Sequence, residues 1–94
     1  MVKLIAQLRA KPGQADVLAG ALLELAGPSR EESGCILYDV CRSKADPDRL
    51  LVLEEWGSQP ALDAHMATAH FKAFLERVGP ALDGEPVLEA IERL

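Results

Sequence analysis

The sequence predicts an α+β domain in which helices cover one face of a four-stranded antiparallel sheet. Two apolar runs flank a turn-rich linker near the middle of the chain, and a further apolar run stands at each end. A segment with helical apolar spacing separates each end run from the central pair. With 94 residues, 49% of them hydrophobic and 27% charged, the chain is expected to fold as one domain over residues 1–94.

The N-terminal half is predicted to begin with a strand and continue as a helix. Val2–Arg9 is a β-favouring apolar run that ends at the turn signal Lys11-Pro12-Gly13. From Gln14 onward the apolar residues recur at helical spacing; they are Val17, Leu18, Ala21, Leu22 and Leu25. Gly27-Pro28 is expected to weaken or bend this helix, which residues 30–32 can prolong until Ser33-Gly34 ends it.

The central runs, Cys35–Arg42 and Leu50–Trp56, read as an antiparallel hairpin around the turn-rich residues 45–48. After it, Ser58 is a suitable N-cap for a short helix through Ala61–His65, because Pro60 is tolerated in a first turn.

Thr68 is predicted to cap a second helical piece whose apolar residues follow an i, i+3, i+4, i+7 pattern up to Gly79-Pro80; they are Phe71, Phe74, Leu75 and Val78. Pro86–Leu94 is most simply a last strand, with a helix from Glu89 as the alternative. The resulting order, β-α-β-β-α-β, is the ferredoxin-like arrangement.

Apolar residues occupy both alternating faces of the predicted strands. Leu4 and Ile5 fall on opposite faces of the first strand, as do Leu50 and Leu51 in the third. A sheet that is apolar on both faces needs cover on both, and the predicted helices cover only one. The sequence therefore predicts a homodimer in which two sheets pack face to face.

The charge pattern excludes some partners. A net charge of −5 without a basic cluster argues against a nucleic-acid surface. No apolar run approaches the roughly 20 residues of a membrane span, and the N-terminus lacks the pattern of a signal peptide, so a cytoplasmic protein without membrane contact is expected.

Cys35 and Cys41 lie about 20 Å apart along one predicted strand, so within one chain they are expected to be free thiols.

No motif for a metal or nucleotide cofactor is present. The chain lacks a phosphate-binding glycine loop and cysteine pairs with zinc spacing. His65 and His70 are five residues apart, which on one continuous helix separates them more than the i, i+4 pair that shares a metal. Each imidazole could instead be a general base, a hydrogen-bond donor or a purely structural group.

Two aromatic residues and one carboxylate are further candidates for a site. Trp56 ends a strand, where its ring can close a pocket between sheet and helices or simply pack. Glu54 shares its face, whereas Glu55 points the opposite way and is expected to be exposed or ion-paired. Tyr38, on the neighbouring strand, can orient an aromatic ligand or serve in the core.

Five short segments carry a resemblance to a known family. In chain order they are Lys11-Pro12-Gly13, Glu32-Ser33-Gly34-Cys35-Ile36-Leu37-Tyr38-Asp39-Val40, Glu54-Glu55-Trp56, Ala61-Leu62-Asp63-Ala64-His65 and His70-Phe71. In this order and spacing they resemble the antibiotic biosynthesis monooxygenase (ABM) family, close to its quinol monooxygenases. The resemblance covers almost the whole chain.

The resemblance implies a ferredoxin-like subunit that pairs into a dimeric α+β barrel. It also implies an enzyme that oxygenates quinols, anthrones or related aromatic phenols with O2 and without flavin, haem or metal. By motif position, His65 or His70 would be the base or anion stabiliser, and Trp56 and Tyr38 would hold the ring system beside Glu54. The wall of the pocket would then be formed by Met66, Phe71 and Phe74.

Three other functions remain open for this fold. A haem-degrading monooxygenase would need an amide side chain near the porphyrin, for which Gln7 is the candidate, although those enzymes usually have asparagine. A small-ketone isomerase would use the histidines as acid and base without O2. A non-catalytic dimer would bind aromatic ligands only.

Overall fold

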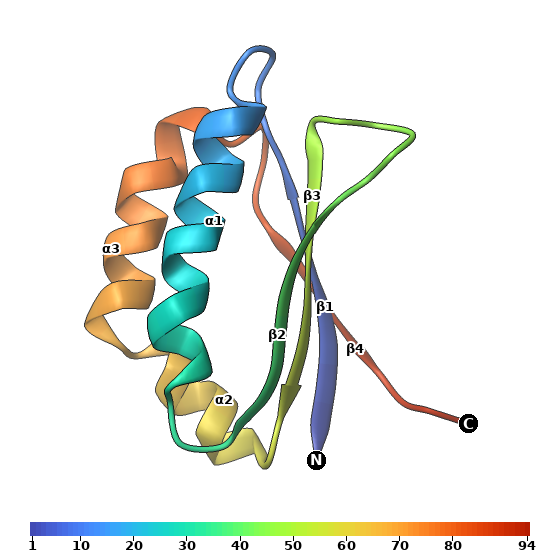
Figure 1. Cartoon of the computed structure of the whole chain (residues 1–94), viewed down its shortest axis with the longest axis vertical. Helices are drawn as coiled ribbons and strands as arrows, with labels where there is room; N and C mark the ends of the chain where they lie inside the picture. Colours follow the sequence, from blue (N-terminus) through green and yellow to red (C-terminus); the bar gives the residue numbers. More distant parts are fainter.

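The computed structural model describes residues 1–94, the whole sequence. Four strands and three α-helices follow one another in the order expected for a ferredoxin-like subunit (Figure 1). The elements are β1 (Val2–Arg9), α1 (Ala15–Arg30), β2 (Cys35–Arg42), β3 (Arg49–Trp56), α2 (Gln59–Met66), α3 (Ala69–Val78), a 3-10 turn (Gly79–Ala81) and β4 (Val87–Ile91). The predicted α+β class is confirmed.

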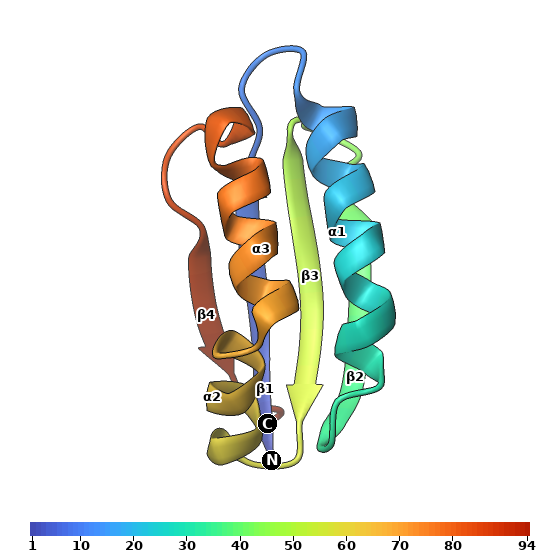
Figure 2. The same cartoon turned by 90° about the vertical axis from the view of Figure 1, so that its left-hand side faces the viewer.

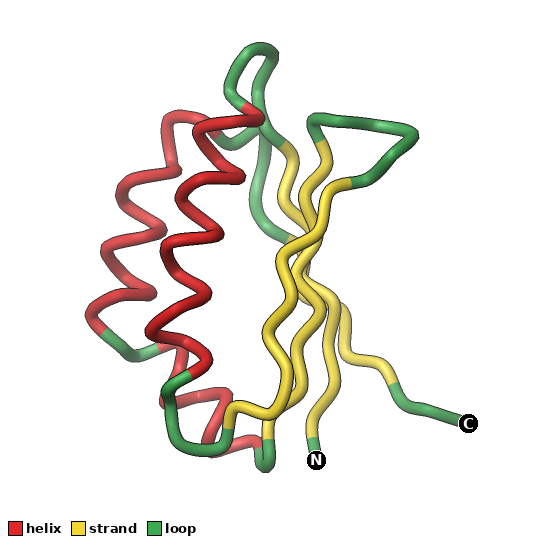
Figure 3. Tube along the Cα trace, in the orientation of Figure 1, coloured by secondary structure: helices red, strands yellow, loops and turns green.

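The four strands form one antiparallel sheet in the order β2-β3-β1-β4. The predicted hairpin is present, and its register sets Tyr38 opposite Glu54. All three helices lie against the same face of this sheet, as the views in Figures 2 and 3 show. The core therefore lies between that face and the helices.

The core forms because α1 and β1 each present one apolar face to the other. On α1 the residues at helical spacing, Leu18, Leu22 and Leu25, are buried, and every second residue of β1 from Leu4 to Leu8 is buried as well. Each such leucine contributes about 1.5–3 kcal/mol by leaving water. α1 continues through Gly27 and Pro28 and ends at Arg30, so the expected helical extension to Glu32 is wrong.

Two side-chain caps fix where α2 and α3 begin. The Ser58 hydroxyl accepts a hydrogen bond from the Ala61 backbone N–H, and the Thr68 hydroxyl accepts one from the N–H of Phe71, both at 3.2 Å. Both predicted N-caps are thus confirmed. The chain between them breaks at Ala67 and Thr68, which starts α3 as a separate helix rather than a continuation of α2.

The second face of the sheet has no helix over it (Figure 1). β4 is a strand, so the helical alternative from Glu89 is wrong. By the strand registers, this face carries six large apolar residues: Ile5, Leu37, Leu51, Leu53, Val87 and Ile91. Glu55 lies on the same face and pairs with Lys3 at 2.9 Å, as its position predicted.

None of the helices has the length and apolar character needed to cross a bilayer.

Candidate functional site

A small apolar pocket lies between the covered face of the sheet and the helices. It has a volume of about 50 Å³, and 13 of its 16 lining residues are hydrophobic. Six residues proposed from the sequence line it: Tyr38, Glu54, His65, Met66, Phe71 and Phe74. Its outer rim includes Leu75 on α3 and Leu88 on β4, both partly exposed, so its mouth lies between these two elements.

His65 is the buried basic group of this pocket. Its side chain is 2% exposed, and three aromatic rings surround it, with centroid distances of 4.6 Å to Trp56, 5.1 Å to Phe71 and 5.6 Å to Tyr38. Nδ1 lies 2.8 Å from Oε2 of Glu32. Since an ionised carboxylate only accepts hydrogen bonds, Nδ1 donates to Glu32, and in the neutral imidazole the lone pair then lies on Nε2.

The second ring nitrogen of His65 is not used within the chain. Nε2 has no hydrogen-bond partner within the chain, and the protein contains no enclosed side-chain nitrogen or oxygen that lacks a partner. His65 is one of the residues that line the pocket. An imidazole fixed on one side by a carboxylate and free on the other can act as a general base.

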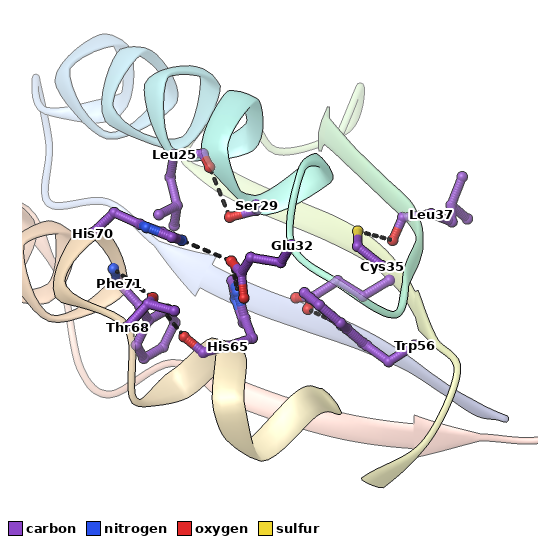
Figure 4. Close-up of polar contacts among 11 residues, drawn as sticks. Leu25, Ser29, Glu32, Cys35, Leu37, Trp56, His65, Thr68, His70 and Phe71 are labelled. Carbon is purple, nitrogen blue, oxygen red and sulfur yellow. Dashed lines mark hydrogen bonds and ion pairs between the residues drawn. The ribbon is translucent and has the colours of Figure 1, made fainter. Parts of the chain in front are cut away.

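His70 contacts the same carboxylate. Its Nε2 lies 2.7 Å from Oε2 of Glu32, so one oxygen bridges the two imidazoles (Figure 4). The expectation that His65 and His70 stay apart is wrong, because it assumed one continuous helix. The break before α3 lets both rings point toward Glu32. The two imidazoles and the carboxylate lie close enough together to form a candidate metal site.

Glu32 reaches this position through the turn that joins α1 to β2. Gly34 in this turn has a φ of +89°, which favours glycine, and a Cβ added there would lie 2.7 Å from the Cβ of Ala61 on α2. The absence of a side chain at Gly34 therefore lets the turn lie directly against α2. This close approach brings Glu32 within hydrogen-bonding distance of His65.

Glu54 is a second carboxylate at the pocket. Its Oε1 accepts a hydrogen bond of 3.0 Å from Nε1 of Trp56, and burial raises its pKa above the ordinary glutamate value. Trp56 is fully buried and does not line the pocket. Its ring packs on the ring of His65, and its N–H donates to Glu54, so it positions both side chains. Burial likewise raises the pKa of Tyr38, so its phenol stays protonated and can only donate or accept a hydrogen bond.

The shifted pKa of Glu54 predicts a pH-dependent stability. Because the folded state binds this proton more tightly than the unfolded state, stability falls as pH rises from the unfolded pKa through the folded pKa. Glu54→Gln keeps an oxygen for Trp56 but does not titrate, so we expect a higher Tm than wild type at about pH 7 and a smaller difference at about pH 4. Thermal unfolding of both proteins at the two pH values measures this; equal differences at both would contradict it.

Two other candidates from the sequence lie outside the pocket. His70 opens onto a groove of about 220 Å³ between α1 and α3, on the far side of Glu32. Gln7 projects from the other face of the sheet, where its Oε1 accepts a hydrogen bond of 2.7 Å from Arg49. Gln7 therefore cannot supply the amide that the haem alternative requires in the pocket.

Glu32 was not among the predicted site residues, although the topology gives a signal for it. The turn after the first helix leads directly into β2, whose first residue pairs with the last residue of β3. Because α2 begins shortly after β3 ends, this turn and α2 lie at the same end of the sheet. An acidic residue in this turn must therefore lie near α2, the helix that carries His65.

Comparisons with known proteins agree with this arrangement. The family described as "Antibiotic biosynthesis monooxygenase" (ABM) matches residues 1–77. "Putative monooxygenase Rv0793" of Mycobacterium tuberculosis is 33% identical over 81 residues, which is 86% of this chain and 79% of that protein. "Probable quinol monooxygenase YgiN" of Escherichia coli K12 is 30% identical over 88 residues, 83% of this chain and 85% of that protein.

One similar protein is considerably longer, and one solved structure has the same fold. The match to "Uncharacterized protein sll1783" of Synechocystis is 30% identical and spans 84% of this chain but only 53% of that protein. The crystal structure of PA3566 from Pseudomonas aeruginosa superposes with a TM-score of 0.92 at 33% identity, covering 99% of this chain and 93% of that one.

Proposed function

Because the chain belongs to the antibiotic biosynthesis monooxygenase family, we propose that it is a cofactor-independent monooxygenase that oxidises a quinol, an anthrone or a related aromatic phenol with O2. The observation that carries this proposal is the Glu32–His65 pair at the wall of an apolar pocket, where Nε2 of His65 has no hydrogen-bond partner within the chain. The monooxygenase names of similar proteins support the reaction class, and the name of YgiN supports a quinol.

The proposed reaction begins with proton transfer from a phenolic hydroxyl to Nε2 of His65. Glu32 balances the imidazolium that forms, and the surrounding aromatic rings keep water away, which strengthens the attraction between imidazolium and phenolate. Triplet O2 reacts slowly with closed-shell molecules, but an electron-rich phenolate can transfer one electron to it. The substrate is thus the reductant, and the protein supplies the base and the dry pocket.

The later steps return the same proton. Recombination of the substrate radical with superoxide forms a carbon–oxygen bond and a substrate peroxide. His65 then donates its Nε2 proton to the terminal oxygen, and the O–O bond breaks with departure of hydroxide. The ring carbon loses its hydrogen as a proton, which combines with the hydroxide to give water, and the carbon becomes a carbonyl. In sum, one quinol and one O2 give one hydroxylated quinone and one water. Glu54, whose pKa is raised by burial, is placed to hydrogen-bond a substrate oxygen.

Substrate entry requires the mouth of the pocket to open. The volume of about 50 Å³ accommodates one or two water-sized molecules, whereas pockets for organic ligands commonly measure about 300–1,000 Å³. Leu75 and Leu88 at the rim are partly exposed and contact solvent, so outward movement of their side chains costs little buried area. We propose that the aromatic substrate enters between α3 and β4.

We also propose that two chains pair through their uncovered sheet faces. This face combines apolar side chains with a central residue, Leu53, that is 37% exposed. Sedimentation at micromolar concentration is expected to give twice the mass of one chain, and Leu53→Lys is expected to shift the protein to the monomer because it places a charge in a desolvated contact. Leu23→Lys, at an exposed leucine of α1, is the matched control. A wild-type monomer would refute the pairing.

O2 consumption distinguishes the proposed reaction from the alternatives. Chelator-treated protein is expected to consume O2 above the autoxidation rate of at least one reduced quinol or anthrone. An isomerase would turn over equally well under nitrogen, and a haem enzyme would shift the Soret band of added haem. A binding protein would retain aromatic ligands without consuming O2. Rates equal to the buffer blank for the whole panel would refute the proposal.

A further inference from the structure

We propose that Glu32, His65 and His70 form a binding site for one first-row divalent transition-metal ion, and that this ion and the base function of His65 exclude each other. The metal site does not depend on the proposed oxygenation. Only the effect of the ion on a reaction rate rests on that function.

The ligand set is chemically suitable. Nδ1 of His65, Nε2 of His70 and a carboxylate oxygen of Glu32 lie within 4.8 Å of one another. Two imidazoles and one carboxylate are borderline-to-hard ligands that bind ions such as Fe²⁺, Co²⁺ and Zn²⁺. The three residues come from the α1–β2 turn, α2 and α3, so the ion would join three separate elements.

Binding an ion requires the ligand atoms to shift. The two imidazole nitrogens, which lie within 4.8 Å of each other, must stand no more than about 4.2 Å apart, the separation of two ligands on opposite sides of an ion at about 2.1 Å. Bonds of about 2.1 Å at right angles separate neighbouring ligands of a six-coordinate ion by about 3.0 Å. The carboxylate oxygen lies 2.8 Å from His65 and 2.7 Å from His70, so both separations must open by about 0.2–0.3 Å. His70 can make this adjustment because its ring is partly exposed at the first turn of α3.

An ion can reach the site from the surface. Exposure increases along the cluster, from 2% for His65 through 14% for Glu32 to 31% for His70. His70 also lines the groove between α1 and α3, from which water can complete the coordination shell. Glu32 supplies one negative charge, which favours a cation at the cluster.

Metal binding would reverse the hydrogen-bonding character of His65 in the pocket. Without an ion, Nδ1 donates to Glu32 and Nε2 has a free lone pair. An ion bonded to Nδ1 takes the lone pair there, so the single proton of the neutral ring must reside on Nε2. The metal-bound protein therefore presents a hydrogen-bond donor to the pocket where the metal-free protein presents a base.

Cobalt titration of chelator-treated protein tests the site without any substrate. We expect wild type to bind one Co²⁺ per chain, with a visible absorption band and a heat of binding, and Glu32→Gln and His70→Ala to bind at least tenfold more weakly. Glu24→Gln, an exposed carboxylate on α1 that pairs with Arg77, is the matched control and should bind like wild type. Circular dichroism verifies that each variant is folded. Absence of one-to-one binding by wild type, or equal affinity in Glu32→Gln, would overturn the site.

Nitrogen NMR of the His65 ring tests the mutual exclusion. On addition of Zn²⁺ we expect the proton to move from Nδ1 to Nε2; a proton that stays on Nδ1 at full occupancy would refute this. If the quinol reaction is observed, Zn²⁺ at full occupancy should suppress it, and an unchanged rate would also refute the exclusion. If no quinol reaction occurs at all, the proposed function fails, while the cobalt and NMR results still decide the metal site.

Discussion

Replacing His65 with glutamine is expected to lower kcat/KM for quinol oxygenation at least 100-fold, about 2.7 kcal/mol in barrier. Glutamine fills similar space and forms hydrogen bonds but cannot accept the phenolic proton. Glu32→Gln is expected to cost about 10–100-fold, because a neutral amide neither fixes the proton of His65 on Nδ1 nor balances the imidazolium. Initial rates of O2 uptake, corrected for autoxidation, measure both effects.

The control for these variants is Lys72→Gln, an exposed substitution on α3 that should leave the rate unchanged. A loss below about tenfold in His65→Gln, roughly 1.4 kcal/mol or less, would remove His65 from the role of base. The same loss in Lys72→Gln as in His65→Gln would show that the effect is not specific to the pocket.

Trp56→Ala is expected to lower the free energy of unfolding by about 3–5 kcal/mol, the largest stability effect of a single substitution in this chain. The ring is fully buried and packs on His65, and its N–H satisfies Glu54. Removing it leaves a cavity and a buried carboxylate without its donor. Urea unfolding followed by circular dichroism measures the change.

Trp56→Phe separates packing from hydrogen bonding. Phenylalanine retains much of the ring but has no N–H, so we expect a loss of about 1–3 kcal/mol from the unpaired Glu54, in addition to a smaller packing term. Combining Trp56→Phe with Glu54→Leu should restore part of this loss, because no buried acceptor then remains unpaired. A loss below about 1 kcal/mol in Trp56→Ala would contradict the account of the core.

Much of the fold was predictable because local signals agreed with one another. Ser58 and Thr68 marked two helix starts, and both act as N-caps. The alternating apolar residues of β1 predicted one face for the helices and a second apolar face, which the strand registers reproduce. The end of α1 was less predictable, because Pro28 within the helix and the residues after it give conflicting signals.

The site was predictable only in part. Residue type and strand parity placed Tyr38 and Glu54 in the pocket, since alternation along a strand determines the face. The meeting of Glu32, His65 and His70 was not predicted, because it depends on the angle between α2 and α3 and on the close approach allowed by Gly34. The spacing of residues along the chain indicates neither the angle between the two helices nor the approach of the turn to α2.

The most direct test of cofactor-independent oxygenation is the fate of labelled oxygen. Chelator-treated protein would be given ¹⁸O2 and a reduced naphthoquinol, and the product would be analysed by mass spectrometry. Cofactor-independent oxygenation predicts a hydroxylated quinone with one ¹⁸O atom, with the other in water, and this product should be lost with His65→Gln. An unlabelled quinone with hydrogen peroxide, or labelled product at the same rate in His65→Gln, would contradict it.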